Sequence, residues 1–226
     1  AFQYYGNGVN TTGLFTPTVA GVGTYPMKAV FTSNKGCQDS VTRNITVWPS
    51  PIAKFGISSP VCEKNALTFT DSSVANFSNI VTWNYNFGDA TNLTRTNATA
   101  FTKTYTNSNT YNATLKVTTD SGCVSSIFTK TIKVNYLPVV NFSLPEICLP
   151  DGRGTFTNSS TILDNTDALF TYNWNFGDAA NTTPSVLKNP THQYSALAPS
   201  GGYLVKLKVT SNNGCVDSLT KPFSNV

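Results

Sequence analysis

The sequence is poor in charge. Charged residues make up 12% of its 226 residues, which is about half the share of a typical soluble domain. Glutamate occurs twice, as Glu63 and Glu146, so good helix formers are scarce. Thr, Val, Phe and Tyr are plentiful and suit strands that have one buried face. We therefore predict an all-β fold.

Residues for catalysis and metal binding are also scarce. Histidine occurs once, as His192, and the chain contains no Gly-x-Ser-x-Gly, His-Glu-x-x-His or Cys-x-x-Cys sequence. One histidine must then serve any acid–base scheme, and a zinc cluster has no support. We expect no catalytic activity, no metal site and no cofactor in these residues.

Long apolar runs and clustered basic residues are absent as well. No apolar run approaches the roughly 18 residues of a membrane-spanning helix. The net charge is +4, but the lysines are scattered along predicted strands, whereas nucleic-acid binding favours a clustered basic stripe. We expect neither a membrane span nor a nucleic-acid partner.

The chain does contain a repeat. Three segments, 25–37, 111–123 and 203–215, align without gaps from a Tyr to a Cys. The second, fourth and sixth residues after each Tyr are apolar, which is the period of a strand with one buried face. A turn sequence (SNKG, TDSG or SNNG) and another strand-like run follow, so each segment predicts a β-hairpin. The apolar positions are Met27, Ala29, Phe31, Ala113, Leu115, Val117, Val205, Leu207 and Val209.

Proline-containing links follow the first two hairpins, as WPSPIAKF (48–55) and NYLPVVNF (135–142). Proline lacks a backbone donor and is disfavoured inside central strands, so the links mark boundaries. We predict a middle segment at 51–136 and a C-terminal segment at 137–226, each about the size of an immunoglobulin-like (Ig-like) sandwich. Residues 1–50, the N-terminal segment, are expected to be the C-terminal half of an Ig-like repeat whose start is missing.

A second repeat lies inside the two complete segments, as WNYNFGDA (83–90) and YNWNFGDA (172–179). Its alternating aromatic residues share one face of a strand and are predicted to lie in the core. Gly-Asp falls at the strand end, where Gly can adopt positive φ and Asp can accept hydrogen bonds from nearby backbone amides. The residues of this structural motif are Trp83, Tyr85, Phe87, Gly88, Asp89, Tyr172, Trp174, Phe176, Gly177 and Asp178.

The alternative is that Asp89 and Asp178 are catalytic acids or calcium ligands. Paired-carboxylate hydrolysis needs two acids within about 5–10 Å, and calcium sites gather several oxygen donors. The two aspartates lie in separate segments, and neither has a second acid nearby in sequence. The structural interpretation is therefore favoured.

These motifs resemble PKD domains, the Ig-like family named after the polycystic kidney disease protein. The resemblance covers 51–226 and rests on Asn-Phe-Gly-Asp, on a following Tyr (TKTY at 102–105, THQY at 191–194) and on the strand that ends in Gly-Cys. Both copies have Ala where the family commonly has a second Gly after the Asp, which affects the turn rather than the fold. His192 occupies the family's His-x-Tyr position, where the other copy has Lys103, so a packing role is expected for it.

The resemblance also suggests a setting. Residues 1–50 lack Phe-Gly-Asp and look like an Ig-like repeat found beside PKD domains in large surface proteins of Bacteroidota, including gliding adhesins exported by type IX secretion. This implies a non-catalytic stalk or adhesive array on a bacterial cell surface. The implied partners are neighbouring Ig-like and PKD domains, surface polysaccharide or other cell-surface proteins, and the secretion machinery. The alternative is an accessory module of a secreted hydrolase such as a protease or chitinase.

The five cysteines follow the repeat. Cys62 and Cys148 come just after the first strand of a segment, and Cys37, Cys123 and Cys215 end the hairpin turns. Pairing within each segment would join Cys62 to Cys123 and Cys148 to Cys215. In an Ig-like sandwich, however, the first turn and the last hairpin lie at opposite poles, and a bridge needs Cα atoms within about 7 Å. Topology therefore favours a bridge between segments, Cys62–Cys215, with the other three cysteines free or paired elsewhere.

Glycosylation sequences are weak signals in a chain this rich in Asn and Thr. Most of the Asn-x-Ser/Thr sequons are expected to arise by chance. Asp-Ser-Val at 39–41 and Asp-Ser-Leu at 217–219 resemble the O-glycosylation sequence of Bacteroidota, which makes Ser40 and Ser218 candidate sites.

Overall fold

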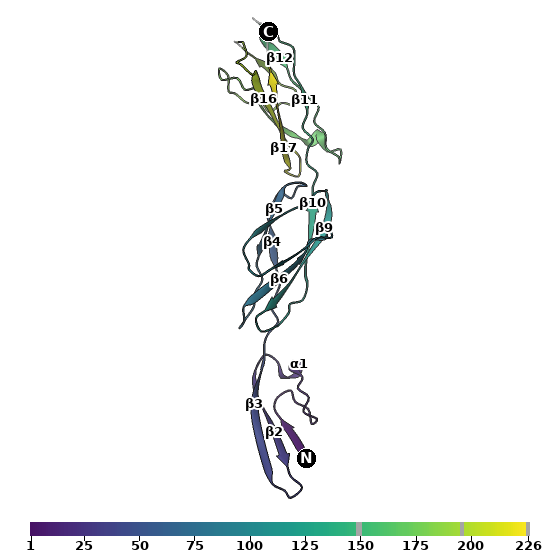
Figure 1. Cartoon of the computed structure of the whole chain (residues 1–226). Coiled ribbons are helices and arrows are strands. Elements are labelled where there is room, and N and C mark those ends of the chain that lie inside the picture. The colour runs from purple at the N-terminus through teal and green to yellow at the C-terminus, as the bar shows by residue number, and fades with distance from the viewer. Residues whose placement is uncertain (148–150, 195–196, 225–226) are drawn as a thin grey trace. The chain divides into compact units, whose positions relative to one another are not determined.

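A computed structural model describes residues 1–147, 151–194 and 197–224 (Figure 1). Within these ranges the fold is all-β, as predicted, and the helical elements are the short α1 (Pro17–Ala20) and the 3-10 turn η1 (Asp167–Leu169). The chain divides into two compact units. The first comprises Ala1–Gly56, Thr70–Thr99 and Ala113–Lys130, and the second comprises Ile57–Phe69, Ala100–Asn112 and Thr131–Val226.

The N-terminal segment forms one antiparallel sheet with the order β1-β2-β3. Its strands are β1 (Phe2–Tyr5), β2 (Gly23–Thr32) and β3 (Gln38–Val47). The last two form the predicted hairpin, and β1 pairs with the other edge of β2. The expected burial is wrong for Phe31, which is 44% exposed, because no second sheet from 1–50 is present in the described structure to cover it.

The middle segment forms two sheets, with the orders β10-β9-β6-β7 and β4-β5-β8. The strands are β4 (Phe55–Ile57), β5 (Ala66–Asp71), β6 (Ile80–Asn86), β7 (Asn92–Arg95), β8 (Phe101–Thr104), β9 (Asn109–Thr119) and β10 (Phe128–Val134). Trp83 of β6 lies opposite Val117 of β9, and Tyr85 lies opposite Leu115. The predicted apolar face of β9 is fully buried, so the alternation of apolar and polar residues correctly identified the face that packs in the core.

Aromatic contacts fill the core of the middle segment. In the first unit, Phe55 of β4 packs edge to face against Tyr85 of β6, with ring centroids 5.7 Å apart, and against Phe128 of β10 at 5.4 Å. These contacts join strands of the two sheets. In the second unit, Phe69 of β5 stacks on Phe101 of β8 at 5.3 Å. The segment is therefore a β-sandwich with an aromatic core.

The C-terminal segment repeats this architecture with shorter strands. They are β11 (Phe142–Ser143), β12 (Arg153–Thr155), β13 (Thr157–Asn158), β14 (Thr171–Asn175), β15 (Thr191–Gln193), β16 (Tyr203–Thr210) and β17 (Val216–Phe223). The sheet β14-β16-β17 faces the pairs β11-β13 and β12-β15 across one hydrophobic core. Phe142 of β11 meets Trp174 of β14 edge to face at 5.0 Å, so the two sides of the sandwich are in direct contact.

Candidate functional site

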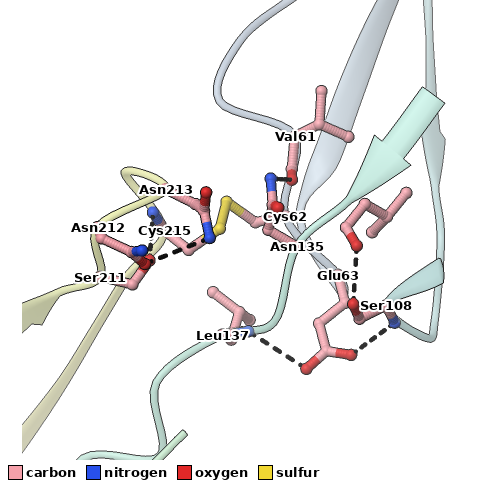
Figure 2. Close-up of a disulfide and its surroundings, with 11 residues drawn as sticks. Val61, Cys62, Glu63, Ser108, Asn135, Leu137, Ser211, Asn212, Asn213 and Cys215 are labelled. Carbon is pink, nitrogen blue, oxygen red and sulfur yellow. Dashed lines mark hydrogen bonds between the residues drawn. A yellow bond between two sulfur atoms is a disulfide. The ribbon is translucent and has the colours of Figure 1, made fainter. Parts of the chain in front are cut away.

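A disulfide joins Cys62 of the middle segment to Cys215 of the C-terminal segment (Figure 2). The two Cα atoms are 5.7 Å apart, and the cysteines are separated by 153 residues in sequence. This is the pairing that sandwich topology favoured. The pairing within one segment, Cys62 with Cys123, is wrong, and Cys123 carries a free thiol.

The loop that presents Cys62 is fixed to the end of its own segment. The backbone N–H of Glu63 donates to the carbonyl of Asn135 at 2.9 Å, and the N–H of Asn135 donates to the carbonyl of Val61 at 3.0 Å. The side-chain amide of Asn135 donates to the same Val61 carbonyl at 3.1 Å. Cys62 is therefore held in a short parallel pairing with the segment's last residues.

Glu63, the next residue, ties this loop to the link between the segments. Its side chain is buried, and its two carboxylate oxygens accept hydrogen bonds from the backbone N–H of Ser108 at 2.9 Å and of Leu137 at 3.3 Å. Figure 2 shows both bonds beside the disulfide. Glu63 was not among the site residues predicted from the sequence. The available signal was the position of a rare glutamate directly after Cys62.

The other half of the bridge is the tip of the β16–β17 hairpin. The N–H of Ser211 donates to the carbonyl of Cys215 at 2.8 Å, and the N–H of Cys215 donates to the Ser211 hydroxyl at 3.1 Å. Gly214 has φ +78°, and a Cβ atom there would lie 3.5 Å from the Pro60 side chain. The tip is thus seated on the Pro60–Cys62 loop, and Cys215 has no exposed surface.

The two Asn-Phe-Gly-Asp motifs form the same turn. The Asn86 and Asn175 side-chain carbonyls each accept a 2.8 Å hydrogen bond from the N–H of the glycine two residues later. That glycine has positive φ in both copies, +77° at Gly88 and +69° at Gly177. A Cβ atom at Gly177 would lie 2.6 Å from the Leu204 backbone nitrogen, so glycine is required there by contact as well as by φ.

The aspartates of the two motifs both accept hydrogen bonds from the chain that follows. Asp89 accepts from the N–H of Thr91 at 3.1 Å, and Asp178 accepts from the N–H of Ala180 at 2.9 Å. The second oxygen of Asp178 lies 3.1 Å from the His192 Nε2 atom, and this pair is buried. The imidazole stacks on the Phe176 ring at 4.2 Å, which is a packing environment that shields both groups from a solvent-borne substrate.

The motif's aromatic residues line the two cores. Those that are buried are Trp83, Tyr85, Phe87, Trp174 and Phe176. Burial, reinforced by the nearby Asp71 carboxylate, raises the pKa of Tyr85 to about 12. Burial, together with the Asp178 carboxylate, likewise raises the pKa of Tyr194. The hydroxyl of Tyr194 donates to the carbonyl of Phe176 at 3.0 Å, so the Tyr that follows the motif fastens the end of the motif strand.

The remaining candidates from the sequence lie apart from the bridge. Cys37 is an exposed free thiol, and Cys123 is a half-buried one. Cys148 lies outside the described residues. Ser40 and Ser218 are exposed on the returning strands of their hairpins, and the preceding aspartate accepts a 2.8 Å hydrogen bond from each serine's N–H.

Neither a metal-ligand cluster nor a membrane-spanning helix occurs in the described ranges. In these ranges, no group of three or more His, Cys, Asp or Glu side chains is placed to hold a metal ion. No helix among these residues has the length and apolar character to cross a membrane.

Comparisons with solved structures retrieve PKD domains of two Vibrio species. The first PKD domain of Vibrio anguillarum Epp has 22% sequence identity and a TM-score of 0.34, with 39% of this chain and 96% of that chain covered. The first PKD domain of the Vibrio cholerae metalloprotease PrtV has 29% identity and a TM-score of 0.33, with 38% and 98% covered. No curated protein matches this chain.

A family model gives a stronger result because it matches most of the chain. The model of the PKD domain matches residues 48–136 and again residues 135–224. Both matches contain one Asn-Phe-Gly-Asp turn, and the Cys62–Cys215 bridge joins them. The chain therefore belongs to the PKD domain family.

Proposed function

We propose that the chain is a non-catalytic segment of a long extracellular repeat protein that serves as a stalk and adhesive array on a bacterial cell surface. The observation that carries this proposal is the Cys62–Cys215 bridge between successive PKD copies. Disulfides persist in oxidising compartments. A covalent link between two domains suits a stalk whose successive domains must stay together under load.

The mechanical argument follows from the position of the bridge. A pulling force applied on either side of the linked cysteines passes through the two sulfur atoms, so the residues between them carry no tension. Fully extended, the 153 residues of that separation would span roughly 500–550 Å at ~3.3–3.6 Å per residue. The bridge withholds this length, and only the chain outside residues 62–215 can extend under load.

Glu63 serves the same joint in this proposal. Its carboxylate binds the backbone of Ser108 within the middle segment and of Leu137 in the link to the next segment. Hydrogen bonds to a charged acceptor are stronger than those between neutral groups. We propose that Glu63 restrains the link next to the disulfide and limits bending at the joint.

The proposal also covers the domain bounds, the route of secretion and the surface partners. We propose domains at 51–136 and 137–226, preceded by half of another Ig-like repeat. We also propose export by type IX secretion, a role in gliding adhesion, and contact with surface polysaccharide or other surface proteins. Ser40 and Ser218 are proposed O-glycosylation sites, and their exposure on β3 and β17 supports this.

The test is intact mass and non-reducing peptide mass spectrometry of the natural parent protein from its source cells, combined with protease treatment of whole cells. We expect a very long repeat chain without a catalytic domain, cleaved by protease added outside the cells and containing the Cys62–Cys215 peptide pair. A chain of moderate length that ends in a hydrolase domain would replace this proposal by that of an accessory module.

The role of the Cys62–Cys215 bridge under tension can be measured directly. Single-molecule stretching of the oxidised chain should lack a contour length of roughly 500–550 Å that appears after reduction. The Cys62→Ser/Cys215→Ser variant should show the full length without reductant, whereas the matched Cys37→Ser/Cys123→Ser variant should behave like the parent chain. Equal contour lengths before and after reduction would contradict the role.

A further inference from the structure

The three hairpin tips that end in Gly-Cys have the same structure. They are residues 33–37, 119–123 and 211–215, and we call them the cysteine tips. In each tip, the N–H of the first residue donates to the cysteine carbonyl, at 2.8, 2.9 and 2.8 Å in chain order. The cysteine N–H donates to the first residue's hydroxyl at 3.1 Å in all three. The cysteine sulfur is therefore presented by the same rigid turn each time.

The glycine that precedes the cysteine also has the same conformation in the three tips. Its φ is +85° at Gly36, +79° at Gly122 and +78° at Gly214. Its N–H donates to the first residue's carbonyl at 3.1, 2.9 and 2.9 Å. A positive φ at this position is needed to close the turn, and glycine adopts it without steric cost.

The tips differ in what covers them. A Cβ atom at Gly214 would meet the Pro60 side chain at 3.5 Å, whereas at Gly36 and Gly122 it would meet nothing within 4 Å in the described part of the chain. Cys215 is fully buried in its bridge, Cys37 is exposed and Cys123 is half-buried. The tip at 211–215 is thus docked on a loop that carries a cysteine, whereas the described residues place no loop against the glycine of the other two tips.

We propose that the tips at 33–37 and 119–123 are docking sites for the first loop of another PKD-type domain, a loop that presents a cysteine as Pro60–Cys62 does here. The established junction supplies the argument, because one tip of the same sequence pattern and geometry already holds such a loop. This proposal rests on the proposed function, since the partner loops belong to neighbouring domains of the same repeat protein.

The chemistry is the same as at Cys62–Cys215. Two thiols form one S–S bond and give up two electrons and two protons to an external disulfide, which is reduced to two thiols. Once Cys123 is bridged, the middle segment lies inside two overlapping covalent loops. Each domain joint of the array then carries one disulfide, and load passes between domains through sulfur rather than through the hydrogen bonds of the sheets.

Exchanging the tips within the full chain tests whether they are equivalent. The Asn213→Lys substitution turns the docked tip into the sequence of residues 33–37, and Ser211→Thr/Asn212→Asp/Asn213→Ser turns it into that of residues 119–123. After reduction, reoxidation in glutathione buffer should restore Cys62–Cys215 in both variants. The effective concentration of the Cys62 and Cys215 thiols for each other should lie within about twofold of that in the parent chain. Failure of either variant to form the bridge would overturn the proposal.

A paired control separates docking from folding. Gly214→Val places a branched side chain at positive φ against Pro60 and should lower the effective concentration by at least about tenfold. The same change at the undocked tip, Gly36→Val, should leave Cys62–Cys215 unaffected. Circular dichroism of both variants reports whether the sheets remain. An unaltered bridge in a folded Gly214→Val variant would show that seating of the tip is irrelevant and would contradict the proposal.

The decisive measurement is the non-reducing peptide map of the parent protein. Peptides containing Cys37 and Cys123 should each be linked to a peptide from the first loop of another PKD-type domain. Free thiols at both positions in a protein that retains Cys62–Cys215 would overturn this inference and leave the stalk proposal intact. A hydrolase domain in the same intact chain would instead remove the proposed function, so the two failures are distinguishable.

Discussion

The two PKD copies share the Asn-Phe-Gly-Asp turn but stabilise it in different ways. In the C-terminal copy, Asp178 pairs with the buried His192, and the indole N–H of Trp174 donates to the carbonyl of Leu187 at 3.0 Å. In the middle copy, the indole N–H of Trp83 is buried and finds no hydrogen-bond acceptor among the described residues. The motif therefore sets the strand end and its turn, while the chain that follows decides how well the polar groups are satisfied.

The chain after the turn differs in a definite way. In the middle copy it forms β7, which pairs with β6 along its length and places Arg95 opposite Trp83. In the C-terminal copy it makes an isolated bridge between Ser185 and Trp174 and then passes over the indole. A regular strand satisfies its own backbone by ladder bonds, whereas the irregular segment leaves a carbonyl available for the indole.

The largest effect is expected from truncating these indoles. Trp174→Ala should destabilise the C-terminal copy by about 3–5 kcal/mol through cavity formation and loss of aromatic packing. Trp83→Ala should cost about 1 kcal/mol less in its own copy because no indole hydrogen bond is lost. Hydrogen-exchange mass spectrometry in increasing denaturant reports the two copies separately. A larger loss for Trp83→Ala would contradict the difference in hydrogen bonding.

The turn glycines should give the next effect. Gly177→Ala combines positive φ with a Cβ atom 2.6 Å from the Leu204 backbone nitrogen, so we expect a loss of about 2–4 kcal/mol. Gly88→Ala meets the unfavourable φ of +77° and should cost about 1–2 kcal/mol. The same hydrogen-exchange measurement compares the two variants. Equal losses of stability would mean that the backbone at Leu204 moves away from the new Cβ atom at little cost.

Replacing the aspartates of the motif should give the third-largest loss of stability. Asp178→Ala leaves the buried His192 without its partner and should cost about 1–3 kcal/mol. Asp89→Ala removes a hydrogen bond acceptor for the backbone of Thr91 at a more accessible site and should cost about 0.5–2 kcal/mol, similar to the loss of a helix cap. Denaturant titration of both variants checks the order. Unchanged unfolding of 51–136 by Asp89→Ala, together with loss of a binding activity, would refute the structural role of the motif.

The smallest effect on stability is expected from ionisation of the core tyrosines, and it is confined to alkaline pH. Tyr85 has a pKa raised from 10.0 to about 12 in the folded middle copy. The folded state therefore holds the proton more tightly than the unfolded chain. The stability that protonated Tyr85 contributes is fully present below pH 10 and is lost as the pH rises toward 12. Denaturant midpoints between pH 9 and 12 measure the loss, and Tyr85→Phe should flatten it. Tyr194→Phe offers the matched change in the C-terminal copy, where the pKa is also raised.

Much of the architecture could be predicted because it depends on local patterns. The period-two apolar residues of β9 and β16 lie in the cores, and the Gly-Cys turns form the hairpin tips. The burial of Phe31 was mispredicted because the same pattern in the N-terminal segment has no second sheet over it within the described residues. A pattern identifies the apolar face of a strand, but burial depends on what else is present to cover it.

The candidate site was less accessible to sequence reasoning. The Cys62–Cys215 pairing followed once an Ig-like topology was assumed, since that topology separates the first turn of a domain from its own last hairpin. Glu63 was missed because its partners are two backbone N–H groups, Ser108 and Leu137, which have no side-chain signature.

By itself, the sequence determined the all-β class, the repeat of the PKD motifs, the hairpin turns and the set of cysteines that could pair. These depend on strand periodicity, on glycine at positive φ and on residue chemistry, all of which are local. Only the tertiary structure decided that Gly214 rests on Pro60, that Glu63 binds the link, and that Asp178 meets His192 while Trp83 lacks an acceptor. Such contacts join residues far apart in sequence, and their formation depends on ångström-scale packing that no local pattern encodes.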